Sequence, residues 1–261
     1  MATTKKISDA DLKAHIEATI PDFHAARLAS LNDLKLRELL RTKNPYLYRA
    51  KNILLASELV QGFLLARLSS QEEGIFGTFL EQLAIFVAEK ACKGRKSAIK
   101  GIDIELEKDG VLHVITVKSG PDWGNDSQIN KMRDYFRTAA RTLRTNSKKR
   151  SLVCINGCCY GRTTKEDKGD YLKLCGQSFW EFISNDLELY RRIIVPIGYR
   201  AQERNDEFAV AFAKVVNQFT KEVLADFCFP DGGIDWDKLL AFNSGRPAPK
   251  LSKKSKSKRQ P

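Results

Sequence analysis

The chain has 261 residues, of which 43% are hydrophobic and 29% charged, a balance typical of a folded globular protein with a sizeable core. No apolar run reaches the roughly 18–20 residues that a membrane helix needs, and the N-terminal residues lack the apolar stretch of a signal peptide, so we expect an intracellular protein without a membrane partner. The formal net charge is +12, and it remains +5 without the seven basic residues of the acid-free segment 246–261, which favours a polyanionic partner such as nucleic acid.

The first part of the chain, residues 1–70, is predicted to be a helical region punctuated by Pro21 and Pro45. A further helix is expected over residues 71–92, where apolar residues recur at helical spacing around Glu81. Its sequence, "QEEGIFGTFLEQLAIFVAEKAC", leads directly into a change of pattern.

Two strands are predicted within "GIDIELEKDGVLHVITVKSG", residues 101–120, joined by a tight turn at Lys108-Asp109-Gly110. A basic helix follows over 127–146, then a short apolar strand in "RSLVCINGCCYG", a polar loop at 161–170, and helical segments from about residue 176 to 227. This order predicts an α/β (α+β) fold in which helices flank a small mixed sheet. We expect a core that contains the sheet, with C-terminal helices, over 71–245 and a disordered basic tail over 246–261.

Several chemistries are disfavoured by what the chain carries. The six cysteines have no CxxC pair or disulfide-like framework, so free thiols are expected. The histidines, His15, His24 and His113, are too few and too scattered for a histidine-metal site. No GxxxxGK[ST] loop is present, which argues against ATP-driven translocation along DNA.

An acid and a lysine stand out on the predicted hairpin. Asp103 begins one strand and Lys118 ends the other, so pairing through the Asp-Gly turn brings them to the same end of the sheet. A carboxylate can hold a hard cation through oxygen, a metal ion can polarise a phosphate and activate water, and a lysine can position that water or stabilise developing negative charge. The alternative interpretation is an ordinary hairpin with a surface ion pair.

The spacing Asp-x12-Thr-x-Lys, from Asp103 through Thr116 to Lys118, resembles the core of the PD-(D/E)xK nucleases, with Thr116 where an acid usually stands. The longer string "TVKSGPDWGNDSQINKM" resembles a group of type II restriction endonucleases, the PmeII-like group. "KNPYLYRAKN", "FGTFLEQLA", "GIDIE" and "NGCCYGR" fit in the same order. Asp122 departs from the pattern, since the group has Asn there, which leaves the role of that side chain open.

The resemblance implies a Mg²⁺-dependent endonuclease that cuts double-stranded DNA at a short site, in the cytoplasm of a bacterium or archaeon. It implies a homodimer, because two-fold DNA symmetry is matched by two-fold protein symmetry, and a companion DNA methyltransferase that protects host DNA without stable contact. Among metal ligands, it implies Asp103 and the backbone carbonyl of Val117.

The acid missing at position 116 must come from elsewhere if the metal needs a second carboxylate. Glu81 interrupts an apolar helical stretch, where a lone carboxylate requires a partner, and related nucleases recruit an acid from a neighbouring helix. We therefore expect Glu81 to complete the site, with Glu105 as the second candidate. Glu107 lies still further along the strand. A structural ion pair of Glu81 with a lysine or arginine is the alternative.

DNA contacts are expected from the segments that follow the predicted site strands. Arg and Lys suit phosphates and guanine, and Asn and Gln can read adenine. A solvated helix face and cysteine-lined core packing are the alternatives for parts of this set. The predicted DNA-binding residues are Trp123, Asn125, Gln128, Lys131, Arg133, Tyr160 and Arg162.

Two other functions remain open from the sequence. One is a DNA-binding protein that has lost catalysis, with Thr116 as the sign of a degraded site. The other is a repair nuclease of the same superfamily. The joint presence of Asp103 and Lys118 disfavours the first.

Overall fold

The computed structural model describes residues 6–146 and 151–246. Its helices are α1 (Asp9–Asn32), α2 (Leu36–Thr42), α3 (Pro45–Ala50), α4 (Ala56–Cys92), α5 (Asp126–Asn146), α6 (Gln177–Ser184), α7 (Leu189–Arg192), α8 (Ile194–Ile197), α9 (Ala201–Phe227) and α10 (Trp236–Ser244). Its strands are β1 (Arg95–Lys96), β2 (Ile104–Lys108), β3 (Val111–Lys118), β4 (Leu152–Cys158) and β5 (Leu172–Cys175). No helix in the described part of the chain has the length and apolar character that crossing a bilayer demands.

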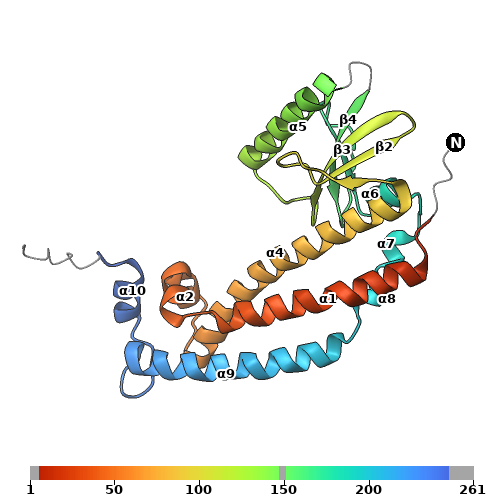
Figure 1. Ribbon diagram of the computed structural model, residues 1–261. Helices are drawn as coiled ribbons and strands as arrows, with labels where there is room; N and C mark the ends of the chain where they lie inside the picture. The colour runs from red at the N-terminus through yellow and green to blue at the C-terminus, as the bar shows by residue number, and fades with distance from the viewer. Residues whose placement is uncertain (1–5, 147–150, 247–261) are drawn as a thin grey trace, which may run out of the picture. The chain divides into compact units, whose positions relative to one another are not determined.

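The strands form a mixed sheet in the order β1-β2-β3-β4-β5. β2 pairs antiparallel with β1 and β3, whereas β4 pairs parallel with β3 and β5. The β2–β3 turn falls at Asp109 and Gly110, whose φ angles of 53° and 75° lie in the left-handed region that a tight hairpin turn requires. The parallel step from β3 to β4 needs a crossover, which α5 supplies (Figure 1).

The two faces of the sheet bury different helices, because successive side chains on a strand point to opposite sides. Ile115 and Val117 of β3 pack in a core formed with α1, α4 and α6. Val114 packs on the other face with Met132 and Phe136 of α5. Figure 1 shows the sheet between α5 and the C-terminal half of α4. The predicted α/β fold with a small mixed sheet is confirmed.

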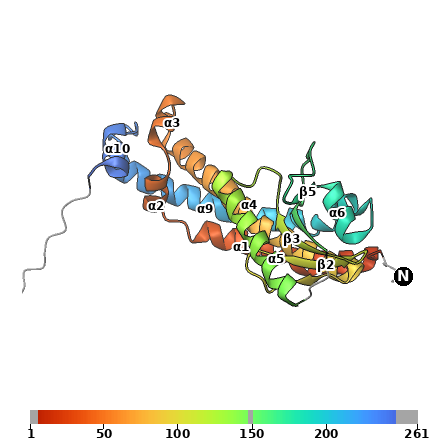
Figure 2. The same cartoon turned by 90° about the horizontal axis from the view of Figure 1, so that it is seen from above.

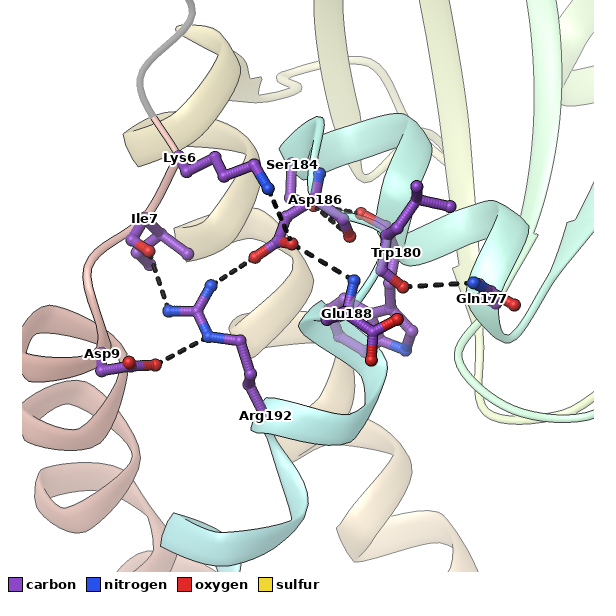
Figure 3. Close-up of polar contacts among 10 residues, drawn as sticks. Lys6, Ile7, Asp9, Gln177, Trp180, Ser184, Asp186, Glu188 and Arg192 are labelled. Carbon is purple, nitrogen blue, oxygen red and sulfur yellow. Dashed lines mark hydrogen bonds and ion pairs between the residues drawn. The ribbon is translucent and has the colours of Figure 1, made fainter.

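A polar cluster ties the segment before α1 to α7 (Figure 3). The guanidinium of Arg192 bonds the carboxylate of Asp9 at 2.7 Å and the carbonyl of Ile7 at 2.9 Å, and it also pairs with the buried carboxylate of Asp186. Lys6 reaches the same carboxylate at 3.4 Å. The buried carboxylate of Asp186 is therefore met by two positive charges, as burial requires.

Within the described residues, the chain divides into two compact units, one formed by the stretch up to Ser30 with Ser69–Val210 and one by Leu31–Leu68 with the stretch from Ala211 onward. The second unit has its own core, built from α2, α3, the start of α4, most of α9 and α10. Figure 2 shows α10 beside α2 and α3. The carboxamide of Asn243 on α10 donates to the carbonyls of Leu40 and Lys43 at 2.6 and 3.1 Å, which fixes α10 on α2.

Several predicted elements need correction. The helices expected before and after residue 70 are one continuous helix, α4. Helix α1 runs through Pro21, with buried Ile16 and Ile20 before the proline and Phe23 after it packed in the same core. The strands β1 and β5 were not predicted. β2 begins at Ile104, one residue after Asp103. Apart from Arg246, the predicted tail lies outside the described residues.

Candidate active site

Asp103 and Lys118 lie at the same end of the β2–β3 hairpin, opposite its turn. Pairing of Ile104 with Ile115 puts Asp103, just before β2, opposite the end of β3. The N–H of Asp103 donates to the carbonyl of Ile115 at 2.9 Å, and its carboxylate accepts from the N–H of Val117 at 2.6 Å. These two bonds hold the acid against the last residues of β3, next to Lys118.

Helix α4 passes beside the same strand end. A Cβ atom at Gly77 would lie 2.6 Å from the hydroxyl oxygen of Ser119, so the helix backbone approaches the residue after Lys118 very closely. Glu81 is one turn further along α4, and residues four apart share a helix face. Its charge also acts on the buried thiol of Cys159, just after β4. Glu81 therefore faces the ends of β3 and β4.

The two carboxylates at this edge repel one another. Burial raises the pKa of Glu81, the negative charge of Asp103 raises it further, and Lys118 and Lys96 oppose these effects. Burial likewise raises the pKa of Asp103, against the N–H of Val117 and the same two lysines. Since pKa values displaced in this way are typical of functional sites, the pair is a candidate for binding a cation.

The donor set fits a hard divalent cation. The described residues contain no group of three or more His, Cys, Asp or Glu side chains arranged for a metal ion. Mg²⁺ keeps several of its waters and needs only one or two protein carboxylates. Glu81 and Asp103, half-buried and mutually repelling, meet that need.

Thr116 stands where the nuclease pattern has an acid, and it is 1% exposed. Its hydroxyl accepts from the carboxamide of Asn156 at 3.3 Å, and the oxygen of that carboxamide accepts from the indole N–H of Trp123 at 3.1 Å. The Trp123 ring in turn lies 5.2 Å from the ammonium of Lys118. Position 116 thus takes part in a buried polar network.

The second acid candidate, Glu105, is engaged elsewhere. Its buried carboxylate accepts from the guanidinium Nε of Arg95 at 3.1 Å and from the hydroxyl of Ser97 at 2.8 Å. Glu107, two residues further along β2, is exposed. These contacts give Glu105 a structural role on the β1–β2 pair.

Two predicted DNA contacts also cap a helix. Asn125 precedes α5, and its side-chain oxygen accepts from the N–H of Gln128 at 3.1 Å, while the side-chain oxygen of Gln128 accepts from the N–H of Asn125 at 3.0 Å. This reciprocal pair is a capping box. The Asn-x-x-Gln spacing before a helix is a signal that the sequence already contained.

The other predicted DNA contacts lie in two places. Lys131 and Arg133 are on α5, where Lys131 is exposed and Arg133 pairs with Asp170 at 3.1 Å. Tyr160 and Arg162 follow β4 and are exposed. Tyr160 donates its N–H to the carbonyl of Ser119 at 2.9 Å, which joins the segments after β3 and β4.

Lys96 was missed by sequence reasoning. It belongs to the two-residue strand β1, opposite Ile104, and its charge acts on both Glu81 and Asp103. A two-residue strand carries no periodicity, so no sequence signal marks it. Asn156 was also not predicted, although the sequence contains a signal for it: a polar amide inside an apolar strand must find hydrogen-bond partners.

An acid and a lysine at one end of a hairpin, on a mixed sheet flanked by helices, are typical of nucleases of the PD-(D/E)xK class. A model of the family described as type II restriction endonuclease EcoO109I matches residues 10–205, and the chain belongs to this family. No curated protein gave a match. The protein is therefore a restriction endonuclease, a class whose substrate is DNA and whose members typically use a divalent metal ion.

Proposed function

We propose that the protein is a type II site-specific deoxyribonuclease of the PmeII-like group. It hydrolyses phosphodiester bonds of double-stranded DNA at a short fixed sequence, with Mg²⁺ and without ATP. The observation that carries this proposal is that Asp103, Lys118 and Glu81 lie together at one end of the β2–β3 hairpin. Both carboxyl groups there have raised pKa values.

The carboxylates of Asp103 and Glu81 and the backbone carbonyl of Val117 would hold the ion. When bound, Mg²⁺ polarises the phosphate and lowers the pKa of a coordinated water. Lys118 contributes a positive charge beside the scissile phosphate, where it stabilises the developing negative charge or orients the attacking water. The N–H of Val117 keeps the Asp103 carboxylate in place.

DNA binding is assigned to the basic face of α5 and to the segment after β4. Lys131 and Arg133 would neutralise phosphates, and Tyr160 and Arg162 lie in the segment joined to Ser119 beside Lys118. A homodimer would match a palindromic site with its own two-fold symmetry. A companion methyltransferase would protect host DNA at that site.

Digestion of several large unmethylated DNAs with Mg²⁺ tests this function. We expect the same discrete fragments in every repeat, and no requirement for ATP. A preparation that binds DNA and cuts none of it would instead describe a protein with a degraded site. Trimming that follows DNA ends or junctions would describe a repair nuclease.

A further inference from the structure

A buried asparagine in the middle of the sheet requires an explanation. Asn156 of β4 is 1% exposed and lies opposite Thr116 in the parallel pairing with β3. Burying an amide costs free energy unless its donors and acceptor are bonded. The amide oxygen of Asn156 accepts from the indole N–H of Trp123 and, at 3.8 Å, from the thiol of Cys158, and its amide nitrogen donates to Thr116. The bonds to Thr116 and Trp123 lead toward the candidate site.

Trp123 connects this amide to the lysine. The residue follows β3, and its ring packs with the core on the α5 face of the sheet. Its N–H is used by Asn156 at 3.1 Å, which fixes the plane of the indole. The ring centroid lies 5.2 Å from the ammonium of Lys118, within the range in which a cation is attracted by an aromatic face.

We propose that Asn156 and Trp123 are positioning residues for Lys118, and that Thr116 completes their network in place of the acid found there in related nucleases. Asn156 orients the indole, and the indole holds the ammonium toward the edge occupied by Asp103. The inference rests on the proposed nuclease function of Lys118. It assigns to Trp123 a positioning role instead of the DNA contact expected from the sequence.

The network explains why a threonine serves at position 116. Its hydroxyl is short enough to meet Asn156 at 3.3 Å inside the core, and a buried carboxylate there would need its own counter-charge. The second carboxylate that binds the metal can then be supplied by Glu81 of α4. Precise placement of Lys118 matters because a displacement of about 1 Å in an active site can lower a rate about 100-fold.

The test compares Asn156→Ala, Trp123→Phe and Thr116→Val with Trp180→Phe. Trp180 is a matched control, because it is buried in the same unit and its indole N–H donates to the carbonyl of Cys159 at 2.8 Å. Two quantities are measured for each variant, the single-turnover cleavage rate at saturating DNA and the DNA dissociation constant without metal. The indole N–H resonance of Trp123, identified by its loss in Trp123→Phe, gives a readout independent of activity.

We expect Asn156→Ala and Trp123→Phe each to slow cleavage about tenfold, within the range for small displacements of catalytic groups. The double variant should be no slower than the slower single variant, since both remove the same hydrogen bond. Asn156 is buried and touches no solvent, so its loss should leave DNA affinity within about twofold, a change of at most about 0.4 kcal/mol. Trp180→Phe should cleave at about the wild-type rate.

Cleavage within twofold of wild type by both Asn156→Ala and Trp123→Phe would overturn the inference, as would an equal loss in Trp180→Phe. Thr116→Val, which keeps the size of the side chain, covers the case in which Asn156→Ala does not fold. If the wild-type protein does not cut DNA, the proposed nuclease function is wrong, and this outcome alone does not contradict the hydrogen-bond network. The Trp123 resonance would then still show, by shifting or not shifting in Asn156→Ala, whether the network exists.

Discussion

Gly77 of α4 and Ser119 after β3 are in such close contact that a Cβ atom on residue 77 would come within 2.6 Å of the serine hydroxyl oxygen. Glycine in a helix interior costs stability relative to alanine. In α4 this cost falls on Gly77, in the turn that precedes Glu81. The absence of a side chain at position 77 therefore lets α4 pass close to the residue after Lys118.

Gly77→Ala should slow cleavage by about tenfold while leaving the protein folded, because the new methyl group forces either the Ser119 hydroxyl or α4 to move beside Lys118. Single-turnover rates at saturating DNA measure this. Gly74→Ala is the matched control in the same helix, since a Cβ atom there meets nothing within 4 Å. It should raise the free energy of unfolding by about 0.5–1 kcal/mol without changing the rate.

The compensating change Ser119→Gly should restore much of the rate in the Gly77→Ala background, because it removes the hydroxyl that the methyl group meets. A full rate for Gly77→Ala alone would show that the close approach of α4 has no bearing on cleavage.

Asp103→Asn and Lys118→Ala should each lower the cleavage rate by about 100-fold or more, the scale of losing one charge-stabilising group in an active site. Specific DNA binding without metal should persist, since neither residue is assigned to base reading. Lys214→Ala, at an exposed lysine of α9, controls for the loss of one positive charge. Near wild-type cutting by either site variant would place the chemistry elsewhere.

The hairpin was predictable because its signal is local. Asp109 and Gly110 must adopt positive φ angles, and an Asp-Gly pair between two strand-like runs is the sequence that permits this. β5 was missed because its four residues, Leu172–Cys175, depend on parallel pairing with β4, a long-range contact with no local pattern. The two compact units, each assembled from separated stretches, also depend on contacts that chain order does not reveal.

The candidate site likewise has features that follow from the local sequence and features that depend on long-range contacts. The placement of Asp103 and Lys118 follows from the hairpin register, and Glu81 stands out as a charge in an apolar helical stretch. The bond between Trp123 and Asn156 joins residues 33 positions apart, and Asn156 was not identified from the sequence. The contact between Gly77 and Ser119 is a matter of distance between a helix and a strand end, which no residue pattern encodes.

Lys131 gives a prediction on salt dependence. If its exposed ammonium on α5 contacts one phosphate, Lys131→Ala should reduce the slope of log K against log salt concentration by about 1. Equilibrium binding to a DNA fragment in EDTA, at several salt concentrations, measures this. An unchanged slope would show that Lys131 does not contact a phosphate. Lys214→Ala, the control at a lysine outside the proposed interface, should leave the slope unchanged.

Glu81 links the stability of the metal-free protein to pH. Burial and the charge of Asp103 raise its pKa above the ordinary value of 4.5. A carboxyl group of this kind contributes stability that is fully present below its unfolded-state pKa and is lost as the pH rises through its folded-state pKa. In the absence of metal, the ionised Glu81 therefore lowers the free energy of unfolding at neutral pH.

Glu81→Gln keeps the shape of the side chain and removes its charge, so the metal-free variant should melt a few degrees above wild type at neutral pH. The difference should vanish as the pH falls below the ordinary carboxyl value, where Glu81 is protonated in both states. Added Mg²⁺ should then raise the melting temperature of wild type more than that of the variant, because binding stabilises in proportion to RT ln(1 + [Mg²⁺]/Kd). Glu73→Gln, at an exposed position of the same helix, should change neither response. If Glu81 served only as the structural partner of a lysine, Glu81→Gln would melt below wild type and both proteins would respond equally to Mg²⁺.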